Sequence, residues 1–528
     1  MMKVSAPTVH LFAFHLRNTV TPSNDRLVDE PELLWRKCDE IFEKLQIAER
    51  LNIEGYSQKD SENPPVSGSS YLYDRSKEPI GNRVSLYPGE GKMIKFQGTV
   101  QVQLPSDLEI LPITGIVYPR RLYDSYALTW NICLPKNFNL NSEKRDDQTL
   151  VPISIFRQFN PDYCLLPDFI GSSLGQTILL TAWLDDEQMI EWLDEEQYQR
   201  DANDLRKIAD ECLAQFIPDP NKRPKFTVRG KLFGSPIFEY GDIPDAIDLL
   251  CQPRSCHIII WLFSKKETDQ KLNFCYWDLP DLFLFRNKAT RLFEDTRFHA
   301  QRGEKTYLEI DTHIRKIDRV LEELPETGEI SEPYLQLLKH NLKIMPRLSL
   351  TLSQVLRNLE YSSNTITIHA KNYSEILEEI RRKLEANMEY LPHTDLSFLE
   401  LFNKKDCYYF QDRIKADLGY FAQGLSLVDK AIASIRGMVE IEKAQRSAKL
   451  QTTLLATAVG LGSGIVFATS YTPIAQQLTV ATPVTASLAK PLSGVAVPIF
   501  YSLLFGVIVG IATYKIAPWL FQLQSKQK

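Results

Sequence analysis

A Gly-Ser-Ser-Leu-Gly run at residues 171–175 matches the pattern of a nucleophile elbow, the turn that presents a catalytic serine. In that motif a strand leads into the serine and a helix follows it, so that the hydroxyl is exposed. Here a proline-containing loop precedes Ser173, and the strand-like residues 177–184 follow it. We therefore interpret residues 171–175 as a turn and predict no catalytic residue in them.

The cysteines and histidines do not form a metal-binding pattern. Cys251, Cys256 and His257 are close in the sequence, but no second Cys/His pair at zinc-site spacing accompanies them. His10 and His15 are five residues apart on a predicted strand, so they point to opposite faces and cannot bind one ion. The sequence therefore predicts no metal site, no cofactor and no enzymatic activity.

The composition is that of a globular protein, with 44% hydrophobic and 24% charged residues among 528. A net charge of −6 provides no basic field, so we expect no nucleic-acid partner. The eight cysteines are scattered through predicted strands and helices, which favours reduced thiols in a cytoplasmic chain.

The elements that must position any site begin with an α+β cytoplasmic region, which we expect in two halves, residues 1–165 and 166–284. The first half opens with a buried strand at 9–16 and an amphipathic helix at 28–53. Residues 55–90 are rich in Ser, Gly, Pro and charge, which predicts a mobile loop. Further strands are expected at 95–104, near 114–118 and at 125–134.

The second half has the clearer pattern. Its order is strand, helix, two strands, helix and strand, which is the order of a ferredoxin-like sandwich. These elements are expected at 177–184, 198–216, 225–231, 236–240, 243–250 and 257–263. Because the first half also opens with a strand, a helix and further strands, we expect two related ferredoxin-like halves.

Residues 285–450 predict a stalk of three long antiparallel helices joined by short turns. In the third helix apolar residues alternate at spacings of four and three, which is the 3.5-residue period of a coiled-coil seam. The seam consists of Ile414, Leu418, Phe421, Leu425, Val428, Ile432, Ile435 and Val439. Small flanking residues widen this apolar face, which favours packing within the chain's own bundle over a coiled coil between chains, and both hold if bundles associate.

Residues 451–528 predict a transmembrane hairpin with spans at 452–471 and 493–514, because a helix of about 20 apolar residues crosses a bilayer. The cations that flank the spans place both termini in the cytoplasm. We therefore expect an integral membrane protein with the bulk of the chain cytoplasmic.

Both predicted spans carry small residues on a four-residue step, which lets helix backbones approach closely in lipid. These residues are Ala456, Gly460, Gly464, Ala468, Gly506 and Gly510. Oligomerisation and packing of the two spans on each other within one chain both explain the step, and we expect a homo-oligomer.

A cytoplasmic α/β domain, long helices and a C-terminal hairpin resemble the layout of CorA-type magnesium channels. The resemblance covers the last third of the chain, and the Gly-Met-Asn signature of that family is replaced by Ser-Tyr-Thr-Pro-Ile at residues 470–474. Magnesium selectivity is therefore not implied. The opening strand and the Leu33-Leu34-Trp35-Arg36 helix also resemble membrane proteins of bacterial conflict systems that are encoded beside caspase-like proteases and TPR proteins.

These features predict a membrane-anchored sensor or effector, in which the α/β region recognises a ligand or a cytoplasmic protein partner and the stalk relays the signal. One alternative is an oligomeric ion channel of CorA-like layout. A second alternative is a membrane-bound serine hydrolase that uses Ser173.

Overall fold

The chain forms two compact units, and each long helix begins in one of them and continues in the other. The first unit contains residues 1–304 and 354–422, and the second contains residues 305–353 and 423–528. The computed structural model describes residues 2–21, 24–27, 30–58, 71–88, 93–103, 108–135, 150–184, 195–241, 256–323, 330–386, 395–480 and 502–516.

One ten-stranded sheet organises the first unit, with the order β12-β13-β14-β11-β1-β9-β8-β6, β10 beside β1 and β7 beside β8. The pair β11–β14 is parallel, and the other pairs of this sheet are antiparallel. The strands are β1 (Lys3–Leu16), β6 (Arg83–Ser85), β7 (Ile94–Gln103), β8 (Leu108–Leu122), β9 (Ser125–Cys133), β10 (Leu150–Pro152), β11 (Gly175–Trp183), β12 (Phe226–Leu232), β13 (Ser235–Tyr240) and β14 (His257–Phe263).

The sheet separates two packed layers, because alternate side chains of a strand point to opposite faces. On β1, Val9, Leu11 and Ala13 enter a large apolar core, which also contains buried side chains of α1 (Leu33–Lys44) and α4 (Glu195–Phe216). The other face of the sheet meets α5 (Lys266–Cys275), η5 (Tyr276–Asp278) and the first turns of α6 (Leu279–Glu323), as shown by the contacts of His10 with Tyr276 and of Phe12 with Phe283.

Short elements complete the first unit. Two small hairpins, β2 (Asn18–Thr21) with β3 (Asn24–Leu27) and β4 (Tyr56–Gln58) with β5 (Tyr71–Tyr73), lie outside the large sheet. The short helices are η1 (Arg75–Lys77), α2 (Ile155–Gln158), η2 (Pro161–Tyr163), α3 (Pro167–Ile170), η4 (Pro220–Lys222), α8 (Ser397–Leu401) and η6 (Phe402–Cys407). Part of the predicted loop 55–90 is therefore regular, since β4, β5, η1 and β6 lie within it.

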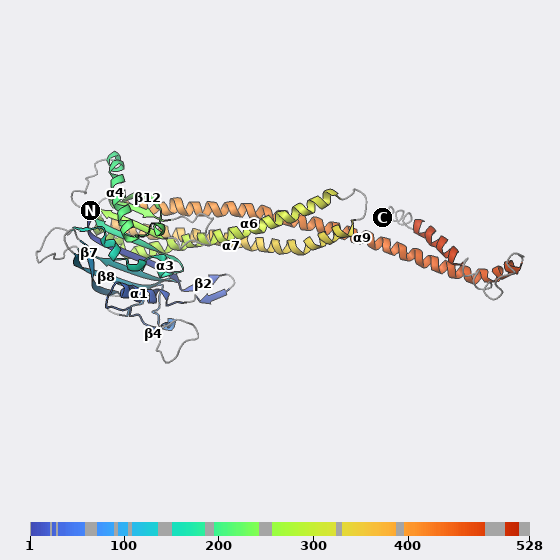
Figure 1. The fold of residues 1–528 in the computed structure, drawn as a ribbon, viewed down its shortest axis with the longest axis horizontal. Coiled ribbons are helices and arrows are strands. Elements are labelled where there is room, and N and C mark those ends of the chain that lie inside the picture. The colour runs from blue at the N-terminus through green and yellow to red at the C-terminus, as the bar shows by residue number, and fades with distance from the viewer. Residues whose placement is uncertain are drawn as a thin grey trace. The chain divides into compact units, whose positions relative to one another are not determined.

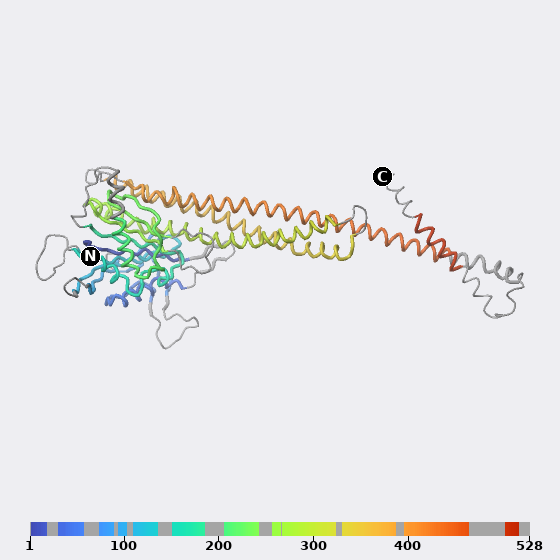
Figure 2. Tube along the Cα trace, turned by 45° about the horizontal axis from the view of Figure 1, so that its top comes forward, coloured from blue at the N-terminus to red at the C-terminus, as the bar shows by residue number. Residues whose placement is uncertain are grey.

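Three long helices, α6, α7 (Glu332–Glu385) and α9 (Tyr408–Val480), occupy most of the chain after residue 278 (Figure 1). Figure 2 traces them as tubes. Within the second unit they pack through specific contacts: His313 of α6 meets Asn341 of α7 at 2.7 Å, and Arg446 of α9 donates to Glu332 at 2.6 Å. Residues 502–516 form a further helical segment.

The prediction of two ferredoxin-like halves is wrong, because β1 and β11 pair directly and place both halves in one sheet. The physical reason lies in β1, whose residues 9–14 are buried on both faces and whose two edges both carry partners, β9 and β11. The predicted helix 243–250 lies outside the described residues.

The predicted transmembrane hairpin is also corrected. Across the described part of the chain, no helix combines the length and the apolar character that a bilayer crossing requires. In α9 the first predicted span begins with three threonines, Thr452, Thr453 and Thr457, whose hydroxyls donate to carbonyls one turn earlier.

Residues 493–501 of the second predicted span, and the side chains of 464–471 in the first, lie outside the described part of the chain. The membrane localisation and the placement of the termini, which were inferred from the two spans, are corrected with the hairpin.

Candidate functional site

The sheet face that meets α5, η5 and α6 carries several buried polar side chains. His10 of β1, Thr181 of β11 and His257 of β14 are each buried there, at 4%, 3% and 6% exposure. Buried polar groups need hydrogen-bond partners, so each must be held in a specific arrangement. Two clusters result, which we call the strand-end pocket and the Glu239 network.

The strand-end pocket is a cavity of about 330 Å³ at one end of the sheet. The strands β9, β11 and β14 run in the same direction, and their carboxyl ends meet at the pocket, where α5 and η5 cover it. Carboxyl ends of parallel strands are a common place for ligands in α/β sheets. The lining residues are Ala6, Thr8, His10, Ile116, Asn131, Cys133, Leu134, Pro135, Thr181, Trp183, Phe263, Asp269, Leu272, Asn273, Tyr276 and Trp277.

His10 connects three sides of this pocket. Its Nδ1 lies 2.8 Å from Asn131 Nδ2 and 3.1 Å from the Tyr276 hydroxyl, and its Nε2 lies 3.4 Å from Thr181 Oγ1. Because the Asn131 amide donates to Nδ1, we assign the proton of the neutral ring to Nε2. Burial lowers the pKa of His10 from 6.5 to about 3, so the ring is neutral near pH 7.

Aromatic rings form two walls of the pocket. Trp183 and Phe263, from the ends of β11 and β14, meet edge to face at 5.4 Å between ring centroids. On the η5 side Tyr276 and Trp277 meet at 5.0 Å, and Trp277 is 40% exposed. Such pairs are rigid apolar surfaces, and the Trp and Tyr rings also carry a polar N–H or O–H, which suits the binding of flat ligands.

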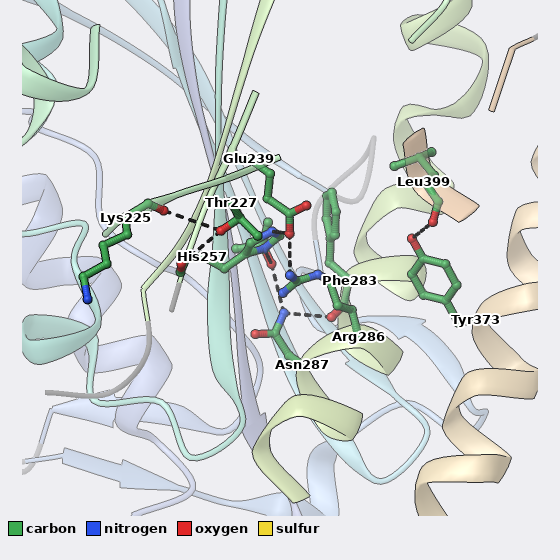
Figure 3. Close-up of polar contacts among 11 residues, drawn as sticks. Lys225, Thr227, Glu239, His257, Phe283, Arg286, Asn287, Tyr373 and Leu399 are labelled. Atoms are coloured by element: carbon green, nitrogen blue, oxygen red, sulfur yellow. Dashed lines mark hydrogen bonds and ion pairs between the residues drawn. The ribbon is translucent and has the colours of Figure 1, made fainter. Parts of the chain in front are cut away.

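The Glu239 network lies further along the same sheet face (Figure 3). His257 Nε2 lies 2.9 Å from Glu239 Oε1, and the Arg286 guanidinium of α6 donates to the same oxygen at 2.6 Å. Thr177 Oγ1 lies 2.9 Å from His257 Nδ1 and accepts from Asn287 of α6 at 3.0 Å. One consistent set of donors satisfies this chain when His257 is neutral and carries its proton on Nε2.

The charges of the network are fixed by its partners. Burial alone raises the pKa of the Glu239 carboxyl, but the Arg286 guanidinium and the His257 hydrogen bond outweigh burial and lower it to about 2. Burial, together with the nearby Arg286 charge, lowers the pKa of His257 to about 4. The network therefore holds one largely buried Glu⁻–Arg⁺ pair and a neutral imidazole.

A row of rings joins the pocket to the network. Tyr276 lies 6.2 Å from Phe12, Phe12 lies 5.2 Å from Phe283, and Phe283 lies 6.4 Å from His257, measured between ring centroids. Phe283 belongs to α6, and Tyr276 belongs to η5, which directly precedes α6. Through these packed rings, η5 is linked to the first turns of α6 and to the Glu239 network. A displacement of η5 would therefore disturb both.

The structure brings Ser173 beside His15, which the sequence did not indicate. The Leu16 N–H donates to Ser173 Oγ at 2.8 Å, and the Ser173 N–H donates to His15 Nδ1 at 3.2 Å. The imidazole thus meets the backbone of Ser173 and not its hydroxyl, whereas an activated serine needs a base hydrogen-bonded to the hydroxyl. The segment connects α3 to β11, with Gly175 at φ +87°.

No cluster of three His, Cys, Asp or Glu side chains suited to a metal ion occurs among the described residues. Cys251 lies outside them, whereas His257 belongs to the Glu239 network.

The predicted seam residues of α9 differ in burial. Ile414, Phe421, Val428 and Ile435, seven residues apart, are at most 3% exposed. The other four, which are half-buried, are Leu418, Leu425, Ile432 and Val439.

The structure brings together four of the predicted small residues, Ala456, Gly460, Gly506 and Gly510, since a Cβ added to Gly510 would lie 3.5 Å from the Ala456 carbonyl oxygen. A Cβ added to Gly460 would lie 2.8 Å from the Gly506 carbonyl oxygen and 3.3 Å from Gly510 Cα, so the two helical segments approach closely. Ala456 is buried at 5% exposure. The surroundings of Gly464 and Ala468 lie outside the described residues.

Sequence reasoning missed both the strand-end pocket and the Glu239 network. The available signal was the placement of His10, Thr177, Thr181 and Glu239 among the apolar residues of buried strands. Only strand pairing shows that they share one face. The chain matches no protein-family model and no curated protein at a significant level, so the function is inferred from this geometry.

Proposed function

We propose that the first unit is a ligand-responsive sensor that passes the state of the strand-end pocket to α6. The observation that carries this proposal is that the pocket is covered by Tyr276 and Trp277 of η5, and η5 continues without a loop into α6 at Leu279. A ligand that contacts η5 therefore contacts the start of a helix that continues to Glu323 in the second unit.

The Glu239 network supplies a defined resting position for α6. Arg286 and Asn287 are successive residues of α6, and they bond to two different strands, through Glu239 of β13 and Thr177 of β11. A ligand shifts a conformational equilibrium only by its different affinity for the two states. A ligand that binds more tightly when η5 is displaced would have to break the hydrogen bonds of this network. The network therefore sets the binding free energy that is needed to move α6.

Amide hydrogen exchange of the full chain tests the coupling. Tyr276→Phe removes the hydroxyl that meets His10 and keeps the ring, so we expect faster exchange along residues 279–290 of α6. Phe274→Ala is the matched control, because Phe274 lies on α5, is 50% exposed and does not line the pocket. A change that stays within residues 273–278, or that the control reproduces, contradicts the relay.

The expected homo-oligomer stays a prediction, as does a protein partner without nucleic acid. The second unit exposes apolar side chains on both helical segments, including Leu454 at 61%, Leu461 at 63% and Leu503 at 60%. Sedimentation velocity measures the mass of the assembly. If these helices associate between chains, replacing all three leucines with serine should lower that mass. Leu350→Ser, at a 62% exposed site of α7, is the control.

A further inference from the structure

We infer that the strand-end pocket binds an uncharged planar heterocycle of nucleoside size whose ring carries an exocyclic amino group. This inference deepens the proposed function, on which the biological role of the ligand rests. The binding itself is argued from the chemistry of the pocket alone. Four properties of the described lining residues lead to it: their charge, their aromatic walls, their hydrogen-bonding groups and the size of the cavity.

The charge of the described lining residues favours neutral ligands over anions. None of the described lining residues is Lys or Arg, and Asp269 is their one carboxylate. His10, the residue that could become cationic, is buried and its pKa is lowered to about 3. A phosphate or carboxylate in the pocket would lose its hydration without gaining a cationic partner, which is costly. Nucleotides and acidic metabolites are therefore disfavoured relative to neutral molecules.

The aromatic side chains favour a flat ligand. Trp183 and Phe263 come from strand ends, whereas Tyr276 and Trp277 come from η5, so rings lie on two different elements around one cavity. Stacking of a base on an aromatic side chain contributes substantially to affinity and tolerates any base with a π-face. Trp277, at 40% exposure, has free surface for such a contact.

The polar groups match an amino-heterocycle better than a simple cation. Asp269 and Asn273 are four residues apart on α5 and line the same pocket, so a carboxylate acceptor and an amide lie on one helix face. Carboxylates accept from exocyclic amino groups, and amides pair with an amino group and its neighbouring ring nitrogen. A quaternary or primary amine would bind the Asp269 carboxylate, but it would offer no acceptor for the N–H groups of the Asn273 side chain.

The volume sets the upper size. A cavity of about 330 Å³ is at the lower end of the about 300–1,000 Å³ range of small-molecule sites. That size suits one heterocycle with a sugar-sized substituent and is too small for a dinucleotide. Adenosine is therefore the representative probe.

Isothermal titration of the full chain with adenosine, followed in parallel by tryptophan fluorescence, tests the inference. We expect adenosine to bind, adenosine monophosphate to bind at least about tenfold more weakly, and Trp277→Ala to weaken adenosine at least about tenfold. Asp269→Asn should weaken adenosine more than it weakens inosine, which lacks the amino group. Phe274→Ala, on the exposed side of α5, should change affinity by less than about twofold.

The inference is overturned if adenosine, guanosine and cytidine all fail to bind at millimolar concentration. It is equally overturned if the monophosphate, choline or glucose binds more tightly than adenosine, or if Trp277→Ala binds like the wild type. Hydrogen exchange with adenosine present separates the two proposals. Binding without any change in α6 keeps this inference and rejects the relay, whereas coupling of Tyr276→Phe to α6 without nucleoside binding does the reverse.

Discussion

Arg286 of α6 donates a hydrogen bond to Glu239 of β13 at 2.6 Å, and both side chains are 13% exposed. This ion pair joins the ten-stranded sheet to the first turns of α6, a helix that begins in the first unit and continues in the second. The same Glu239 oxygen also accepts a hydrogen bond from His257. The contact is thus a largely buried ion pair between β13, in the sheet that forms the pocket, and α6, which follows directly after η5.

Breaking one side of this pair should be strongly destabilising. In Arg286→Met the Glu239 carboxylate stays buried without its cation, which costs about 3–5 kcal/mol in comparable sites. Replacing both partners, with Glu239→Leu added, should recover part of that loss. Urea unfolding measures both, and Lys371→Ala in the exposed pair Lys371–Glu375 should change stability by less than about 1 kcal/mol. A double variant less stable than Arg286→Met would contradict the argument.

The stability of the first unit should fall as the pH is lowered from 7 toward 4. The pKa of His10 is about 3 in the fold against 6.5 for an ordinary histidine, so between these values the unfolded chain binds a proton that the folded chain does not. Stability then rises with pH across this window and is lost as the pH falls, by up to about 1.4 kcal/mol per pH unit. Urea unfolding at pH 7, 6 and 5 measures the slope, and His10→Gln should make it shallower by about that amount. A variant with the wild-type slope would show that His10 does not control it.

Glu239 should add a separate loss at lower pH. Burial raises the pKa of this carboxyl, but Arg286 and His257 lower it from 4.5 to about 2 in the fold, so its contribution is present above about pH 4.5 and is lost as the pH falls toward 2. Acid unfolding monitored by circular dichroism checks this. Glu239→Gln should remove the part of the transition between pH 4.5 and 2, and an unchanged acid profile would reject the assignment.

Local patterns in the sequence indicate several elements, because they depend on neighbouring residues. Residues 177–184 overlap β11, and the 3.5-residue period from Ile414 to Val439 lies within α9. The pairing of β1 with β11 could not be obtained this way, since their paired residues are more than 150 positions apart, as His10 and Leu179 are. No local period shows which distant edge a buried strand takes.

The candidate site was missed for the same reason. His257 was considered as a metal ligand beside Cys256, its neighbour in sequence, but its hydrogen-bond partners are Thr177 and Glu239 from two other strands, and Arg286 of α6 binds the same Glu239 oxygen. The prediction of a membrane hairpin was wrong for a different reason. It depended on the absence of charged residues in 452–471, whereas a bilayer crossing requires both length and apolar character, which no helix among the described residues combines.

Glu442 should protect the backbone N–H of Ile330, two residues before α7 begins, from hydrogen exchange. It occupies the position seven residues after Ile435, is 2% exposed, and its Oε2 accepts from the Ile330 N–H at 3.1 Å. Glu442→Ala leaves that N–H without its acceptor, so hydrogen exchange at Ile330 should accelerate. Glu440→Ala, two residues earlier and exposed, is the control. Equal exchange in both variants would show that the carboxylate does not hold this N–H.

Two glycines of α9 should respond in opposite directions to the same substitution. A Cβ at Gly424 would overlap the Tyr307 ring of α6, whereas nothing lies within 4 Å of a Cβ at Gly437. Gly437→Ala should stabilise the chain by roughly 0.5–1 kcal/mol, because alanine loses less backbone entropy in a helix. Gly424→Ala gains the same propensity but must displace the ring, which costs about 1–3 kcal/mol, so its net effect should be destabilising. Thermal unfolding of both variants measures the difference. If Gly424→Ala raised the melting temperature as much as Gly437→Ala, the close packing of α9 on Tyr307 would not exist in solution.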